Sequence, residues 1–138
     1  MAVDPRITIL LDLYGELLTE KERSALDYYY NDDLSLKEIA DNEAAERRSR
    51  KELGVGLDER DTISRQGVRD TIKRAEAKLL DWEEKLHLSE RAMRVNAAVD
   101  MIIAKAKEIS DCNIKHGCYR EINDAATEII SAANSLYE

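Results

Sequence analysis

The sequence predicts an all-α protein, and three observations support this. Apolar residues recur at spacings of three and four through most of the chain, which is the period of one face of an α-helix. Capping residues precede several of these stretches. The 138 residues include one proline and five glycines, and 36% of the residues are charged. No stretch shows the alternation of a half-buried strand.

The first 53 residues contain three predicted helices. Residues 5–18 form one amphipathic helix, and Pro5 suits its first turn. The sequences TEKE at 19–22 and SLKE at 35–38 are capping boxes, which start helices at about 20–30 and at 36. The residues of the first helix that we expect to point inward are Ile7, Leu10, Leu11, Tyr14, Leu17 and Leu18.

A polar segment separates the third helix from the next apolar stretch. Residues 41–63 begin with good helix formers, so the helix can run to about Leu53 and stop at Gly54-Val55-Gly56. A mobile insertion is the alternative. The sequence predicts an exposed loop at 57–61, and the basic cluster at 47–51, interleaved with acids, is typical of a solvated helix face.

Residues 64–86 predict a long helix that begins at the N-cap Ser64. Its apolar stripe consists of Val68, Ile72, Ala75, Leu79, Trp82 and Leu86. Together with LSLKEIA at 34–40, this helix reads as the second half of a helix-turn-helix, in which the N-terminal residues of the second helix meet nucleic acid. The usual connection is a turn of about 3–4 residues, whereas Ser64 follows Ala40 at a distance of 24 positions.

The last fifty residues predict a helical hairpin. Ser89 is a candidate cap, and the sequence at 110–119 breaks the helical pattern. The inward stripes are Ala92, Val95, Val99, Ile102, Ala106 and Ile109 before the break, and Ile122, Ala126, Ile129, Ala133 and Leu136 after it. We therefore expect a helix-turn-helix domain at 1–88, with an insertion at about 44–62, and a hairpin at 89–138 for packing or dimerisation.

The charge distribution matters more than the net charge of −8. Residues 1–42 hold 4 basic and 10 acidic groups, whereas residues 43–74 hold 9 basic and 7 acidic groups. A local basic face can bind phosphates because charges act over a Debye length of about 8–10 Å. No apolar run reaches the roughly 20 residues of a membrane helix, and the N-terminus lacks the basic region of a secretory signal. We expect a cytoplasmic protein whose two cysteines are free thiols.

Six residues form the candidate nucleic-acid site. At 100° per residue, Arg65, Arg69 and Lys73 form a stripe beside the packed face of their helix. An arginine can contact guanine through two hydrogen bonds, and a glutamine can do the same with adenine. Ser64, Lys73 and Arg74 are better suited to phosphate contacts, which position a protein on DNA without specifying the sequence. The candidate residues are Ser64, Arg65, Gln66, Arg69, Lys73 and Arg74.

Other chemistry finds little support in the sequence. Cys112, His116 and Cys118 lie within seven residues, but a structural zinc site usually needs four ligands, so we expect no metal and no cofactor. Tyr28-Tyr29-Tyr30 could stack on bases, although their position beside apolar residues favours packing. There is no GxxxxGK[ST] loop, no GxSxG elbow and no HExxH. The sequence indicates a protein that is not an enzyme.

Two blocks resemble the YlxM family of small bacterial proteins, which is similar in turn to region 4 of bacterial primary sigma factors. The most specific pieces are LTEKERSALDYYYNDDLSLKEIA and ISRQGVRDTIKRAE, within 10–43 and 63–88. The resemblance implies a sigma-like helix-turn-helix bundle in which the six candidate residues belong to the recognition helix. This chain differs from the family pattern by an insertion of about 18 residues after Asn42-Glu43 and in its last 50 residues.

The sequence thus leads to three hypotheses about function. The first is a DNA-binding regulator that acts as a dimer on double-stranded DNA and is linked, through the resemblance, to the signal recognition particle pathway. The second is a protein–protein adaptor that uses the same fold on the targeting machinery without touching DNA, which the acidic residues 1–42 favour. The third is binding to the RNA of the targeting particle, although no RRM or KH signature is present.

Overall fold

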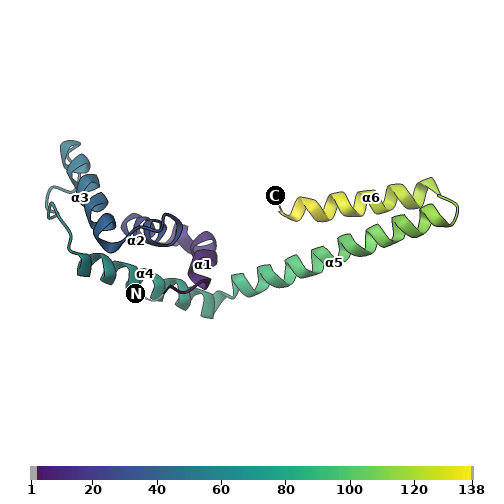
Figure 1. The fold of residues 1–138 in the computed structure, drawn as a ribbon, viewed down its shortest axis with the longest axis horizontal. Helices are drawn as coiled ribbons and strands as arrows, with labels where there is room; N and C mark the ends of the chain where they lie inside the picture. Colours follow the sequence, from purple (N-terminus) through teal and green to yellow (C-terminus); the bar gives the residue numbers. More distant parts are fainter. Residues whose placement is uncertain (1–2, 138) are drawn as a thin grey trace. The chain divides into compact units, whose positions relative to one another are not determined.

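The structure is a computed structural model that describes residues 3–137, and it confirms the all-α fold, since these residues form helices and no strand. Figure 1 shows the helices in chain order. The elements are α1 (Arg6–Tyr14), the 3-10 turn η1 (Gly15–Leu17), α2 (Glu20–Leu26), the π-helical segment η2 (Asp27–Asn31), α3 (Leu36–Glu52), α4 (Arg65–Leu86), α5 (Leu88–Lys115), α6 (Arg120–Asn134) and the 3-10 turn η3 (Ser135–Tyr137).

The chain divides into two compact units, residues 1–89 and residues 90–138. The first unit contains α1 to α4, and the second contains most of α5 together with α6. Among residues 3–137, no helix combines the length and the apolarity needed to cross a lipid bilayer.

Both predicted capping boxes are present. The Thr19 hydroxyl accepts a hydrogen bond from the backbone N–H of Glu22 at 3.3 Å, and the Ser35 hydroxyl accepts one from the N–H of Glu38 at 3.2 Å. In each box the glutamate carboxylate accepts from the backbone N–H of the capping residue. These bonds satisfy amides that a helix N-terminus leaves without a partner. They fix where α2 and α3 begin.

The core of the first unit is formed by α1 to α4. Its buried members are Ile7, Leu10, Leu11, Tyr14, Leu18, Ala25, Leu26, Ile39, Ala40, Val68, Ile72, Ala75 and Leu79. The three tyrosines at 28–30 and Trp82 are partly buried against this core. The three tyrosines therefore pack against the core of the first unit.

Two residues expected in this core are exposed. Leu17 is wrongly predicted because the α-helix ends at Tyr14 and continues as a 3-10 turn, whose shorter period directs Leu17 outward. Leu86 is the last residue of α4 and is 54% exposed. The stripe of α4 is buried only where α1, α2 and α3 pack on it.

The second unit is a hairpin in which α5 and α6 run antiparallel beside each other (Figure 1). The predicted break at 110–119 is too long, because α5 continues to Lys115 and only residues 116–119 connect the helices. Buried Asn113 explains this: its side chain bonds both backbone groups of Tyr119, at 2.7 and 2.9 Å. Ser89 is not the cap, because α5 already begins at Leu88.

The predicted apolar stripes of the hairpin are buried only in part. The buried residues are Val99, Ala106 and Asn113 on α5, and Ala126 and Ala133 on α6. The larger apolar residues beside them are exposed. Two helices alone cannot cover both sides of such a stripe.

Candidate nucleic-acid interface

The first turns of α3 and α4 pack together as the two halves of a helix-turn-helix. Ile39 and Ala40 of α3 belong to the same buried core as Val68 and Ile72 of α4, and the two helices are in contact. The long connection therefore does not separate them. The second helix is held by its buried face, which leaves the remaining faces of its N-terminal half available to a ligand.

Ser64 sets the start of α4. Its hydroxyl accepts a hydrogen bond from the backbone N–H of Gly67 at 3.0 Å, as expected of an N-cap. Gly67 has little room for a side chain, because an added Cβ would lie 2.9 Å from a side-chain carbon of Ile63. The chain thus enters α4 tightly packed, and the residues that follow Ser64 have a defined position.

All six predicted site residues are exposed. Arg65, Arg69 and Lys73 lie on one side of α4, at successive steps of about 40° around the helix. Within residues 3–137, none of these three cations has an ion pair or a side-chain hydrogen bond. They form what we call the α4 basic stripe. The stripe is a positively charged surface whose charges are not neutralised by neighbouring carboxylates.

Arg74 lies apart from the α4 basic stripe. It lines a shallow hollow of about 270 Å³ on the opposite flank of α4. The other lining residues are Thr71 and Lys78 of α4 together with Thr19, Lys21 and Glu22. Lys78 is already paired with the carboxylate of Glu22 at 2.8 Å. Arg74 has no ion pair within the described part of the chain. The structure therefore splits the predicted set into one stripe and one separate cation.

Gln66 is engaged within its own helix. Its side-chain N–H donates to a carboxylate oxygen of Asp70 at 2.9 Å. The glutamine keeps one N–H and its carbonyl oxygen, which is the donor and acceptor pair that adenine requires. Asp70 also places a negative charge among the predicted phosphate contacts. Sequence analysis missed this partner, although the i,i+4 spacing of a glutamine and an aspartate is a recognised signal.

The connection between α3 and α4 is ordered by charge pairs. Of the two alternatives for residues 41–63, the extended helix is confirmed, because α3 runs to Glu52 and the chain then returns along it. Gly54 and Gly56 have φ of +80° and +69°, which supplies the turn. Leu53, Val55 and Leu57 at its tip are exposed.

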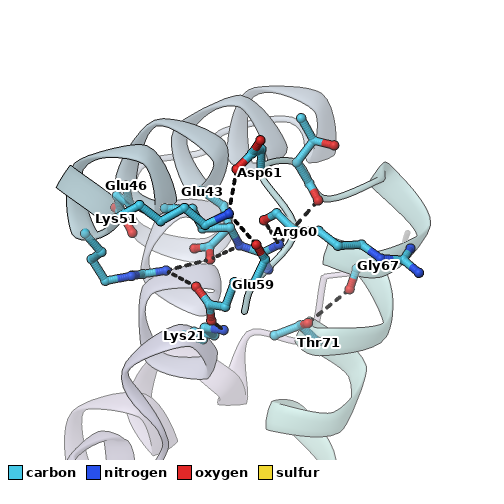
Figure 2. A network of polar contacts seen from close by, with 12 residues as sticks. Lys21, Glu43, Glu46, Lys51, Glu59, Arg60, Asp61, Gly67 and Thr71 are labelled. Atoms are coloured by element: carbon cyan, nitrogen blue, oxygen red, sulfur yellow. Dashed lines mark hydrogen bonds and ion pairs between the residues drawn. The ribbon is translucent and has the colours of Figure 1, made fainter. Parts of the chain in front are cut away.

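Figure 2 shows the network of polar contacts around Glu43, Glu59 and Asp61. Arg47 of α3 makes three hydrogen bonds, one within its own helix and two to the loop. Its guanidinium donates to the carboxylate of Glu43 at 2.9 Å and to the backbone carbonyls of Arg60 and Thr62 at 3.1 and 3.3 Å. Glu43 is buried and also accepts from Arg50 at 3.3 Å. One arginine of α3 thus holds the final residues of the loop just before α4 begins.

Glu59 and Asp61 fasten the rest of the loop. The carboxylate of Glu59 pairs with Lys21 of α2 and, at 3.3 Å, with Arg50 of α3. Lys51 pairs with Asp61 at 2.6 Å, and this hydrogen bond lowers the pKa of the Asp61 carboxyl. The prediction of a solvated basic face at 47–51 is therefore wrong for three of its four cations, because they bind carboxylates of the same chain.

Cys112 and Cys118 are exposed free thiols. Across residues 3–137 there is no group of three or more histidine, cysteine, aspartate or glutamate side chains placed to hold a metal ion.

The fold and the packing of α3 on α4 define a helix-turn-helix protein. A family model described as "Putative helix-turn-helix protein, YlxM / p13 like" (UPF0122) matches residues 3–53 and 56–117. The chain belongs to this family. The match is interrupted only in the loop tip and extends to residue 117, so the expected difference in the last 50 residues is wrong for most of α5.

Curated relatives agree with this assignment. A "UPF0122 protein" of Clostridium kluyveri is 46% identical over 90 residues, which is 65% of each chain. The protein NT01CX_2214 of Clostridium novyi is 33% identical over 125 residues, 91% of this chain and 93% of the relative. The protein ABC2295 of Shouchella clausii is 40% identical over 111 residues, 78% and 85% of the two chains. The alignment with the first of these spans about two thirds of that relative's length.

Proposed function

We propose that this protein is a non-enzymatic regulator that binds double-stranded DNA through α4, as a homodimer in the cytoplasm. The observation that supports this most is the α4 basic stripe, whose cations have no partner among residues 3–137. In a helix-turn-helix, the N-terminal part of the second helix enters the major groove. That part of α4 begins at Ser64 and carries Arg65, Gln66 and Arg69.

The pairing of charges within the loop strengthens the proposal. Arg47, Arg50 and Lys51 are neutralised by Glu43, Glu59 and Asp61. Residues 64–74, in contrast, contain four basic groups and one acidic group. An acidic protein can therefore present one positive face to phosphates, because screening confines each charge to about 8–10 Å.

Each site residue has a proposed role. Arg65 and Arg69 would read guanine edges, and Gln66, oriented by Asp70, would read adenine. Ser64 and Lys73 would contact phosphates and so position the helix. Arg74, on the other flank of α4, would contact a phosphate outside the groove.

Fluorescence anisotropy with random duplex DNA tests the proposal. Random duplex DNA offers no cognate bases, so the four cations Arg65, Arg69, Lys73 and Arg74 would all meet phosphates, and affinity should fall about 100-fold between about 50 and 200 mM salt. The Arg65→Ala, Arg69→Ala variant should bind more weakly and should lower the salt slope by about 2. A charge-matched control is Lys107→Ala, Lys115→Ala, which removes two exposed cations from α5 and should leave DNA binding unchanged.

The adaptor remains the second candidate, because residues 1–42 hold 10 acidic and 4 basic groups. An adaptor would act on a basic partner, and the resemblance directs attention to the signal recognition particle machinery. Absence of DNA binding at low salt would overturn the first proposal in favour of this one. Tighter binding to a structured RNA than to duplex DNA would instead indicate the targeting-particle RNA.

A further inference from the structure

The α5–α6 hairpin has two parallel rows of apolar residues, and the structure buries only one of them. The buried row repeats every seven residues: Val99, Ala106 and Asn113 on α5, and Ala126 and Ala133 on α6. The second row has the same repeat: Val95, Ile102 and Ile109 on α5, and Ile122 and Ile129 on α6, each 43–48% exposed. Leu136 continues it and is 66% exposed.

Three shallow hollows run along the second row, which we call the open row. The first, of about 300 Å³, lies between Val99 and Leu136. The next, of about 460 Å³, is lined by Ile102, Ile109 and Ile129, and the last, of about 290 Å³, reaches Tyr119. Neighbouring hollows share lining residues, so they form one apolar groove along the hairpin.

A seven-residue repeat of this kind is typical of helices that pack in a bundle. In a four-helix bundle each helix turns one row toward its hairpin partner and the adjacent row toward the facing pair. The buried row of α5 and α6 makes the contact between the two helices of the hairpin. The open row has the spacing and the position of a row that contacts a facing pair of helices.

We propose that the open row packs against the open row of a second copy of this chain, forming an antiparallel four-helix bundle. The face is about 25 Å long, from the helical rise, and two helices or about 20 Å wide. Pairing two such faces buries roughly 1,000 Å², the size that separates specific interfaces from incidental contacts. The same row lies on both copies, so its seven-residue repeat has the same spacing on the two surfaces. A two-fold dimer requires such a self-complementary surface.

Charged residues beside the open row decide how the two copies align. The Ser110 hydroxyl contacts the side-chain oxygen of Asn123 at 2.7 Å, which fixes the register of α5 against α6. Lys105 lies five positions before Ser110, and Glu128 lies five positions after Asn123. The two residues therefore lie at the same height, each on the outer flank of its helix and both exposed.

A two-fold axis parallel to the helices places α5 of one copy beside α6 of the other at equal height. Lys105, which is paired with Glu108 of its own helix at 3.1 Å, then faces Glu128 of the second copy. A two-fold axis across the helices would instead place α6 beside α6 and bring the acidic flanks of Glu121 and Glu128 together. Charge complementarity thus favours the first arrangement.

Light scattering on the full chain tests the proposal at about 50 µM, well above a micromolar Kd. Wild type should show twice the mass of one chain, and Ile102→Glu, Ile129→Glu should show the mass of one chain. The matched control is Ile114→Glu, because Ile114 is an exposed isoleucine on α5 outside the open row; this variant should remain dimeric.

A charge exchange tests the alignment without altering apolar packing. Lys105→Glu should weaken the dimer several-fold, and adding Glu128→Lys should restore it. A wild-type monomer would overturn the proposal, and so would a dimer that survives the Ile102→Glu, Ile129→Glu change while circular dichroism shows intact helices. Equal effects of the single and double exchange would overturn the alignment. None of these measurements involves DNA, so failure of the DNA proposal would leave them unaffected.

Discussion

The hydroxyl of Tyr14 donates a hydrogen bond to a carboxylate oxygen of Glu83 at 2.9 Å, across 69 positions of the chain. The same hydroxyl accepts from the backbone N–H of Leu88 at 3.2 Å, and the Glu83 carboxylate accepts from the N–H of Ser89 at 3.1 Å. Tyr14 at the end of α1 and Glu83 of α4 thus supply capping groups for the start of α5. These partners satisfy amides that a capping serine would otherwise bond.

Tyr14→Phe should destabilise the first unit. The hydroxyl is buried and bonds a charged group, and burial is the main reason why the pKa of Tyr14 is raised. Its removal leaves the N–H of Leu88 without this acceptor, so we expect a loss of about 1–2 kcal/mol. Urea unfolding followed by Trp82 fluorescence reports on this unit, because the Tyr14 and Trp82 rings lie 6.3 Å apart. Tyr119→Phe in the second unit is the control, and equal unfolding midpoints for both variants would contradict the prediction.

The helices are predicted correctly from the sequence where one local signal determines the structure. The hydroxyl caps Thr19, Ser35 and Ser64 are such signals, since each satisfies a backbone amide within its own turn. The predictions are wrong where a residue distant in the sequence determines the local structure. Ser89 could have capped α5, but Tyr14 and Glu83 bond the first amides instead, and no local pattern reveals a partner so far away in sequence.

The candidate site was predictable in composition but not in arrangement. The helical period places Arg65, Arg69 and Lys73 together, and the structure shows them exposed. The helical period could not show which cations bind carboxylates of the chain. Arg50 and Lys51 pair with residues of the loop that follows α3, and the path of that loop cannot be read from the helical period. The pattern therefore predicted where basic residues gather better than which of them remain free.

Glu59→Gln should loosen the loop between α3 and α4 without unfolding the domain. The change removes the carboxylate that pairs with Lys21 and Arg50. Ion pairs near the surface contribute about 0–1 kcal/mol, so the global unfolding midpoint should change little. Hydrogen exchange of residues 53–62 should become faster. Asp58→Asn, at an exposed neighbour, should leave exchange unchanged, and unchanged exchange in the Glu59 variant would argue against the network as the restraint.

The Tyr28 hydroxyl should lose its proton at a higher pH in the folded protein than a free tyrosine does. Its hydroxyl donates to Glu46 at 2.5 Å, and this bond, followed by burial, raises the pKa of Tyr28 to about 12 from its usual 10.0. Folding thus favours the neutral phenol, so its contribution to stability is complete below pH 10 and is lost as pH rises through about 12. The difference in tyrosinate absorbance between wild type and Tyr28→Phe should have its midpoint near pH 12.

The Glu46→Gln variant separates the causes of that late titration. Without the carboxylate charge, the Tyr28 midpoint should move toward 10. Glu52→Gln, an exposed change on the same helix, should leave it in place. A midpoint near 10 in the wild-type protein, with native circular dichroism at that pH, would show that the hydroxyl and the Glu46 carboxylate are not bonded in solution.

Asp70→Ala should increase the affinity of the protein for DNA while reducing its selectivity, if α4 is the DNA-binding helix. The Asp70 carboxylate repels phosphates and holds the side chain of Gln66. Removing one exposed charge near the DNA should raise affinity about two- to fivefold at low salt. The salt slope should stay the same, because the number of cations that meet phosphates is unchanged. The freed glutamine should discriminate less well against base changes in a selected site, which anisotropy with matched and substituted duplexes would measure. Weaker binding to all duplexes would instead mean that Asp70 supports the structure of α4, and helicity measured by circular dichroism would then fall in parallel.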